Sequence, residues 1–415
     1  MPSGTTRLAL AGALAAVALA PGFVAQPAAA APTTPATVVA QRYAVPTCSI
    51  RPAPARPVTA VPWAQTRYAP ERLSPLATGA GVIVAVIDSG VDTAHPQLAG
   101  QVLPGADFLD SGGDGTLDCV GHGTAVASII AAKPQAGVGF RGLAPGAKIL
   151  PIRISEQQIV DGKESGRTVD PPRFASAIRW AVDRGAEVIN LSVVLYEDNP
   201  AVRAAIEYAI AKDVVVVAAV GNLHNNGDPR PYPASYDGVL GVGAVGPDGL
   251  RMDFSQVGSY VDVVAPGGGI LAAAPGGGHI AEDGTSYAAP FVAATAALIR
   301  QYRPELGAQQ VIERILATAD PAAGGRRSAE YGSGVLNPYR AVTETRAVGR
   351  PEQPTPLPPK QIDPAAVARE ERRAESRQRS LVLAAIGGTI AGGAVVLAVV
   401  LPQGARRRWR PAERT

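Results

Sequence analysis

One stretch of ten residues decides how this 415-residue chain is interpreted: Asp283-Gly284-Thr285-Ser286-Tyr287-Ala288-Ala289-Pro290-Phe291-Val292. The glycine predicts a turn, and the small apolar residues after it predict a helix, so Ser286 is expected at a helix N-terminus. The first backbone N–H groups of a helix have no partner within the helix. They can therefore donate hydrogen bonds to a capping hydroxyl or to an oxyanion formed beside the serine. The stretch alone leaves both interpretations open.

Three motifs lie upstream of this serine. Residues 82–87 are a continuous apolar run that predicts a strand buried on both faces. Asp88 follows at its carboxyl end, where open α/β sheets carry their chemistry. His122, between two glycines, opens an alanine-rich helix, and Asn222 follows the apolar run 214–220. Taken singly, the histidine could be a structural residue and the asparagine a turn residue.

Taken in chain order, the four motifs resemble those of the subtilisin-like serine proteases, over roughly residues 75–342. The resemblance implies that His122 acts as general base, that Asp88 orients it and that Ser286 is the nucleophile. It also implies that Asn222 donates to the oxyanion. This chemistry needs no metal or organic cofactor, and no loop has the spacing of calcium ligands.

The alternation of apolar runs with helical patterns predicts an α/β fold. We expect a parallel sheet with helices on both faces, in one domain of roughly 270 residues that is large enough to bury a substantial core. The expected strands are 82–87, 148–154, 187–193, 214–220 and 239–245, and the expected helices lie near 123–132, 173–184, 200–211, 286–302 and 308–319.

Both ends of the chain carry segments with the composition of membrane-targeting elements. Residues 1–31 combine Arg7, an apolar core and small residues, as in a secretory signal peptide. Residues 381–401 form a charge-free apolar run of 21 residues, long enough for one transmembrane helix. The basic tail 402–415 predicts a cytoplasmic end, so the domain is expected on the extracytoplasmic (periplasmic) side.

Two Pro-rich segments flank the domain. Residues 32–74 form an N-terminal extension, of which residues 32–62 are expected to run extended along a surface, and residues 343–380 form a Pro-rich and charged stalk. The small net charge of +3 comes partly from the tail, and aromatic residues make up only 5% of the chain. Neither feature favours nucleic-acid binding.

The chain has only two cysteines, Cys48 in the extension and Cys119 just before His122. An exported setting and an even count favour a disulfide between them. Two reduced thiols and a metal-binding pair are the alternatives, although further ligands for a metal are not evident.

A narrower resemblance is to the mycosins, the membrane-anchored subtilases of type VII secretion systems. The residues that carry it, besides the carboxyl-terminal span, are Tyr68-Ala69-Pro70-Glu71-Arg72-Leu73, Asp118-Cys119-Val120-Gly121-His122-Gly123-Thr124 and Phe140-Arg141-Gly142-Leu143-Ala144-Pro145-Gly146. The resemblance implies association with the membrane complex of the secretion system. It also implies an extension that wraps the catalytic domain and is not a removable inhibitory prodomain.

The chain departs from the subtilase pattern at two places. Tyr287 follows the serine where many subtilases have methionine. Where subtilases usually continue an Asn-x-Ser sequence with small glycines that line the primary specificity pocket, this chain has Ser192 followed by the branched Val193 and Val194. The pocket is therefore expected to be narrow and to prefer small residues such as Ala before the cut. The same three residues could pair with substrate backbone as an added strand.

These features support an endoprotease that cleaves exported proteins. The alternative is mainly a structural subunit of the secretion complex, with proteolysis secondary. A surface-anchored protease for general digestion is a weaker reading, because a narrow pocket and a tethered extension argue against broad specificity.

Overall fold

The computed structural model describes Cys48 and residues 54–110, 112–160, 163–323, 325 and 327–345, with Arg379 and Pro402. Nearly all of these belong to the first of the two units of the chain, residues 1–345 and 346–415. No helix among the described residues is long and apolar enough to cross a membrane. The predicted signal peptide and the span at 381–401 lie outside the described residues, as does nearly all of the predicted stalk and tail.

The sheet predicted from the apolar runs is present. Seven strands pair in the order β2-β3-β1-β6-β7-β8-β9, and every pair is parallel. The strands of this sheet are β1 (Ile83–Asp88), β2 (Ala106–Asp107), β3 (Lys148–Arg153), β6 (Val188–Leu191), β7 (Val215–Ala219), β8 (Val239–Val245) and β9 (Val263–Pro266). Five of them overlap the expected runs to within two residues at each end; β2 and β9 were not predicted.

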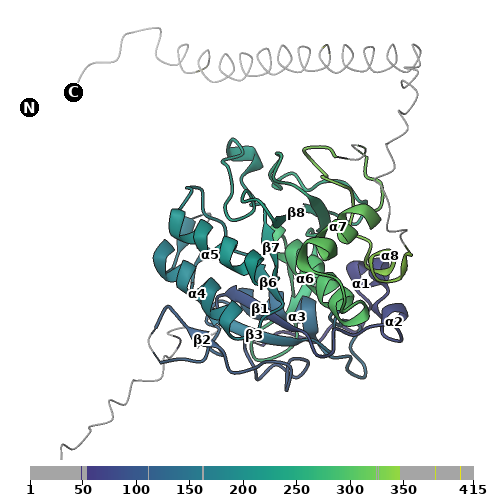
Figure 1. Cartoon of the computed structure of the whole chain (residues 1–415), viewed down its shortest axis with the longest axis horizontal. Helices are drawn as coiled ribbons and strands as arrows, with labels where there is room; N and C mark the ends of the chain where they lie inside the picture. The colour runs from purple at the N-terminus through teal and green to yellow at the C-terminus, as the bar shows by residue number, and fades with distance from the viewer. Residues whose placement is uncertain are drawn as a thin grey trace, which may run out of the picture. The chain divides into compact units, whose positions relative to one another are not determined.

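Helices cover both faces of the sheet, as predicted (Figure 1). Helices α3 and α6 contribute to the core on one face, and α4 and α5 to the core on the other. The helices are α1 (Trp63–Tyr68), α2 (Pro70–Leu73), α3 (His122–Ala131), α4 (Pro171–Asp183), α5 (Pro200–Ala211), α6 (Thr285–Tyr302), α7 (Ala308–Thr318) and α8 (Pro338–Thr343), with a 3-10 turn, η1, at His224–Asn226.

The continuous apolar character of the strands follows from the two cores. Successive side chains of a strand point to opposite faces, so Val84 and Val86 enter the core with α3 and α6 while Ala85 and Ile87 enter the core with α4 and α5. All four are fully buried. A strand buried on both faces cannot alternate between polar and apolar residues, which explains the pattern in residues 82–87.

Two segments without a predicted strand or helix contain short antiparallel hairpins. The segment 155–172 includes β4 (Gln158–Val160) and β5 (Lys163–Ser165), and the segment 267–283 includes β10 (Ile270–Ala273) and β11 (His279–Glu282). Strands of three or four residues are too short to give a clear alternating pattern. The second hairpin matters for the site, because β11 ends four residues before Ser286.

The N-terminal extension is attached to the domain at several points. Cys48 forms a disulfide with Cys119, three residues before His122. The backbone N–H of Ala55 donates to the carbonyl of Gly277 at 2.9 Å, and the N–H of His279 donates to the carbonyl of Arg56 at 3.1 Å. The described part of the extension therefore runs beside the start of β11, consistent with the expected extended conformation.

Two buried histidines complete this attachment. The N–H of Val58 donates to Nδ1 of His279 at 3.1 Å, and Nε2 of His279 lies 2.7 Å from the Oε1 of Gln97. The N–H of Gln97 in turn donates to Nδ1 of His95, whose Nε2 lies 3.0 Å from the carbonyl of Gly278. Each Nδ1 accepts a hydrogen bond, so both rings are neutral with the proton on Nε2. Burial, and then the neighbouring His95, lower the pKa of His279 to about 4.

We expect this histidine pair to make the domain sensitive to acid. A folded-state pKa of about 4, below the ordinary 6.5, means that the unfolded chain binds more protons between these pH values. The contribution of neutral His279 to the free energy of unfolding is therefore complete above pH 6.5. It is lost as the pH falls toward 4, which lowers that free energy by up to about 3 kcal/mol. Melting temperatures of the wild type and of His279→Gln should converge as the pH falls through this window. A wild-type melting temperature that does not change between pH 7 and pH 4 would contradict the expectation. The control is His224→Gln, on η1.

Candidate active site

The predicted site residues come together at the carboxyl edge of the sheet. Asp88 ends β1, Ser192 directly follows β6, and Asn222 lies three residues after β7. Helix α3 begins at His122, and Ser286 is the second residue of α6. From β1 the chain first adds β2 and β3 on one side and then β6 to β9 on the other, so the strand order reverses beside β1. The carboxyl ends of the strands at such a reversal are the usual place for a site in an open α/β fold.

Asp88 and His122 are hydrogen-bonded to each other. Nδ1 of His122 lies 2.7 Å from the Oδ1 of Asp88, which also accepts the N–H of Ser89 at 2.7 Å. The Asp88 side chain is 3% exposed and that of His122 28%. Burial lowers the pKa of His122, but the charge and hydrogen bond of Asp88 outweigh it and raise the pKa above its ordinary value. With Nδ1–H directed at Asp88, Nε2 is left as the proton acceptor.

The close approach of β1 and α3 depends on a glycine. A Cβ added to Gly123 would lie 2.1 Å from the carbonyl oxygen of Gly90, so only glycine fits beside His122 at this point. The glycine that follows His122 in the motif is thus explained by packing.

The hydroxyl of Ser286 donates to the carbonyl of Ser192 at 3.3 Å. Within the described part of the chain, no hydrogen bond joins Ser286 to His122. In empty sites, contacts between a nucleophile and its base are often long and tighten only when substrate is bound.

Asn222 is held with its amide in one orientation. Its Oδ1 accepts the backbone N–H of Thr285 and the Thr285 hydroxyl, each at 3.0 Å. The same hydroxyl accepts the N–H of Gly221 at 3.1 Å. With Oδ1 engaged twice, Nδ2 has no hydrogen-bond partner among the described residues. It lies on the side of Gly284, 3.4 Å from where a Cβ on that residue would be. Thr285 is thus an orienting residue whose role the sequence did not predict.

Asp118 is a second residue whose role the sequence did not predict. Its buried carboxylate accepts five hydrogen bonds of 2.6–3.1 Å. The donors are the hydroxyls of Ser89 and Thr124 and the backbone N–H groups of Val120, Gly121 and Thr124. Asp118 therefore shapes the loop that delivers His122. Its bonds to residues two and three positions later are typical of aspartate in turns, and this was the available signal.

Ser192 lies beside the start of α6, and Val193 and Val194 follow it in the chain. The Ser192 hydroxyl donates to the carbonyl of Ser286 at 2.9 Å and accepts from Nδ2 of the buried Asn190 at 2.9 Å. Val193 and Val194 are half-buried. Neither makes a backbone–backbone hydrogen bond within the described residues, whereas the next residue, Leu195, pairs with Tyr232. The edge at 193–194 is thus open to another strand.

Tyr287 packs against the histidine. The ring centroids of His122 and Tyr287 are 5.3 Å apart, tilted by 57°. Burial, with the nearby Glu282 and Asp88 carboxylates, raises the pKa of the Tyr287 hydroxyl, which therefore stays neutral. The described residues contain no group of three or more His, Cys, Asp or Glu that could hold a metal ion.

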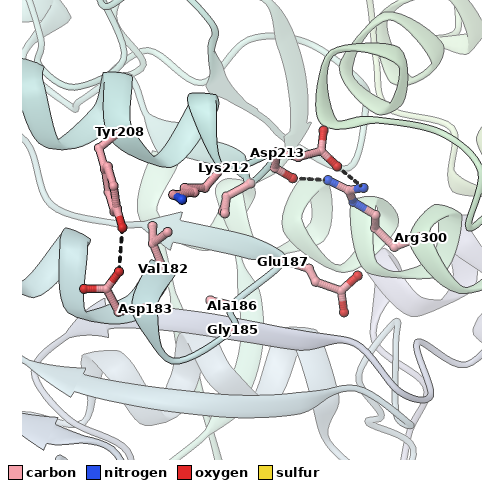
Figure 2. Close-up of a pocket in the computed structure, with 10 residues that line it drawn as sticks. Val182, Asp183, Gly185, Ala186, Glu187, Tyr208, Lys212, Asp213 and Arg300 are labelled. Atoms are coloured by element: carbon pink, nitrogen blue, oxygen red, sulfur yellow. Dashed lines mark hydrogen bonds and ion pairs between the residues drawn. The ribbon is translucent and has the colours of Figure 1, made fainter.

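A cavity of about 440 Å³ lies at the opposite edge of the sheet (Figure 2). It is lined by Glu187 and Val214, which directly precede β6 and β7, and so lies at the amino ends of these strands. The Tyr208 hydroxyl donates to Asp183 at 2.7 Å, and Arg300 pairs with Asp213 at 2.9 Å. Tyr208 and Arg300 thus each have an acidic partner, and none of the predicted site residues lines the cavity.

Comparison with known proteins places this arrangement in a family. The Subtilase family profile, Peptidase S8, matches residues 79–334. The thermophilic serine proteinase of Bacillus sp. (strain AK1) is 42% identical over 63% of this chain, and the match spans 62% of that protein. Mycosin-1 of Mycobacterium tuberculosis (strain ATCC 25618 / H37Rv) is 35% identical over 81% of this chain and 84% of its own length. A chain in the structure of an intact ESX-5 inner membrane complex is 30% identical, with a TM-score of 0.61 over 85% of this chain and 98% of that chain.

Proposed function

Because the chain belongs to the subtilase family of serine proteases, with mycosins among its relatives, we propose that Asp88, His122 and Ser286 form its catalytic triad. The proposed reaction is hydrolysis of peptide bonds in exported proteins. The observation that carries the proposal is the partly buried Asp88–His122 hydrogen bond at the sheet edge where α6 begins with Thr285 and Ser286.

In the proposed mechanism each group acts through a particular atom. Nε2 of His122 takes the proton from the Ser286 hydroxyl as its oxygen attacks the substrate carbonyl, and later gives that proton to the leaving amine. Asp88 stabilises the imidazolium that forms in between. Nδ2 of Asn222 and the backbone N–H of Ser286 donate to the oxyanion. Water then hydrolyses the acyl-enzyme by the same steps in reverse order.

The oxyanion role of Asn222 has a measurable consequence. We expect Asn222→Ala to lower kcat by about 10²–10³-fold with little change in KM, because the lost donor acts mainly on the transition state. Steady-state kinetics on a peptide substrate measure this. Asn226→Ala, on the same exposed loop, is the matched control, and an equal loss of activity in both variants would point to disruption of the loop instead.

Substrate is proposed to add as a strand to the open edge at 193–194, with a small residue immediately before the cut. Val194 packs against the same core as α6, whereas Val193 packs against the opposite core, so we expect Val194 to narrow the pocket and Ala to be preferred immediately before the cut. Profiling with a peptide library measures the preference. A profile dominated by Phe, Leu or Lys at that position would refute it.

Association with a type VII secretion membrane complex is proposed from similarity along the chain. The likeness to mycosin-1 and to a chain of the ESX-5 inner membrane complex covers 81% and 85% of this chain, more than the protease domain alone. Anchoring by residues 381–401, with the domain on the extracytoplasmic side, is part of this proposal. The same similarity supports a second candidate function, a mainly structural subunit whose docking matters more than its cleavage.

A fluorophosphonate probe separates the two candidates. The Oγ of an activated serine attacks the probe phosphorus and displaces fluoride, so the full-length protein should acquire an adduct on the peptide that contains Ser286, located by mass spectrometry. Ser192→Ala, which retains Ser286, checks that the adduct is not on the neighbouring serine. A folded protein that forms no adduct would refute the triad and favour the structural function.

A further inference from the structure

Trp63 reaches from the N-terminal extension to a glycine turn beside the proposed nucleophile. It is the first residue of α1 and is half-buried. Its indole Nε1–H donates to the carbonyl of Gly268 at 3.0 Å, although the two residues are 205 positions apart. No pattern in the sequence indicates that these two residues are in contact.

The turn at 267–269 fits tightly against the sheet. The N–H groups of Gly267 and Gly268 both donate to the carbonyl of Val245, at 3.0 and 3.3 Å. An added Cβ would lie 2.5 Å from the Cβ of Ala244 at the first glycine and 2.5 Å from the sulfur of Met252 at the second. The turn therefore has little room to move toward β8, and the Trp63 indole adds a further fixed point on the carbonyl of Gly268.

The same turn holds the backbone that leads into α6. The N–H of Gly284 donates to the carbonyl of Gly267 at 2.8 Å. The N–H of Gly269 donates to the Oδ1 of Asp283 at 2.6 Å. These two bonds position Asp283 and Gly284, which directly precede Thr285 and Ser286.

We propose that Trp63 is a positioning residue for Ser286. The indole holds the turn, the turn holds Asp283 and Gly284, and these place the first turn of α6. Both the Ser286 oxygen and its backbone N–H depend on that placement. The inference rests on the proposed function of Ser286 as nucleophile, and it makes the extension a working part of the active domain.

The test is Trp63→Phe in the full-length protein, which keeps a ring and removes the N–H. The readouts are the second-order rate of fluorophosphonate labelling at Ser286, kcat and KM for a peptide, and the melting temperature. We expect labelling and kcat to fall about tenfold with KM nearly unchanged, since a displacement of 1 Å at reacting atoms can cost up to about 10²-fold. The matched control is Trp180→Phe. Trp180 is also half-buried, and its ring centroid lies 6.5 Å from that of Phe108. This variant should be labelled at the wild-type rate.

A second variant keeps the inference falsifiable. Asp283→Ala removes the bond on the other side of the turn, so its effect on labelling and that of Trp63→Phe should not be additive in the double variant. Additive effects would overturn the inference, as would a lower melting temperature in Trp63→Phe with unchanged labelling per folded molecule. Wild-type protein that does not label at Ser286 would overturn the proposed function itself, whereas equal labelling of wild type and Trp63→Phe would overturn only the inference.

Discussion

Replacing Ser286 with alanine is expected to lower kcat for peptide hydrolysis by about 10⁶-fold. The hydroxyl is the only group of the proposed mechanism that forms a bond to the substrate, so no neighbouring side chain replaces it. His122→Ala is expected to cost about the same. Without Nε2 the serine keeps its proton, and a neutral hydroxyl is a poor nucleophile.

The double variant makes this prediction sharper. Ser286 and His122 act as one unit, so Ser286→Ala/His122→Ala should be no slower than either single variant. Ser128→Ala is a control for loss of a serine elsewhere, on α3, and should keep wild-type kinetics once its folding is confirmed. Steady-state rates with active-site titration measure all four proteins. If Ser286→Ala retained even a hundredth of the wild-type rate, another nucleophile would have to be sought.

The parts of the fold that the sequence predicted are those with long continuous patterns. Residues 82–87 and 239–245 are apolar because both faces of β1 and β8 are buried, and such runs are recognisable without any tertiary information. Strand β9, Val263–Pro266, is equally buried but has four residues and is followed by three glycines, so its pattern is too short to identify. The strand order also escaped prediction, because it depends on which faces the crossover helices cover.

The residues of the site likewise differ in how far a local sequence pattern could predict their roles. Asp88, His122, Asn222 and Ser286 stand in short motifs beside predicted strand ends and helix starts, so the sequence could place them together. Trp63 acts through hydrogen bonds between segments far apart in the chain, and no local pattern indicates such a partner. The role of Asp118 was not predicted, because a carboxylate in a loop is usually solvated and only the packed structure shows that five donors surround it.

Replacing Asp88 with asparagine is expected to lower kcat by about 10⁴-fold. In the wild type one oxygen, Oδ1, accepts both the His122 Nδ1–H and the Ser89 N–H, while Oδ2 is buried without a partner among the described residues. Asparagine must either turn its amide toward His122, which favours the wrong tautomer, or bury that amide unpaired. In both cases the negative charge that stabilises the imidazolium is lost.

The pH dependence gives Asp88→Asn a second, independent readout. Catalysis needs neutral His122 and is lost as the pH falls through its pKa, which Asp88 raises. Removing the carboxylate should therefore shift the acid limb of the kcat/KM profile to lower pH while the plateau falls. Asp248→Asn, an exposed loop acid whose Oδ1 accepts the N–H of Leu250, should change neither the plateau nor the limb. An acid limb that stays in place in Asp88→Asn would mean that the titrating group is not His122 paired with Asp88, and the proposed division of roles within the triad would be wrong.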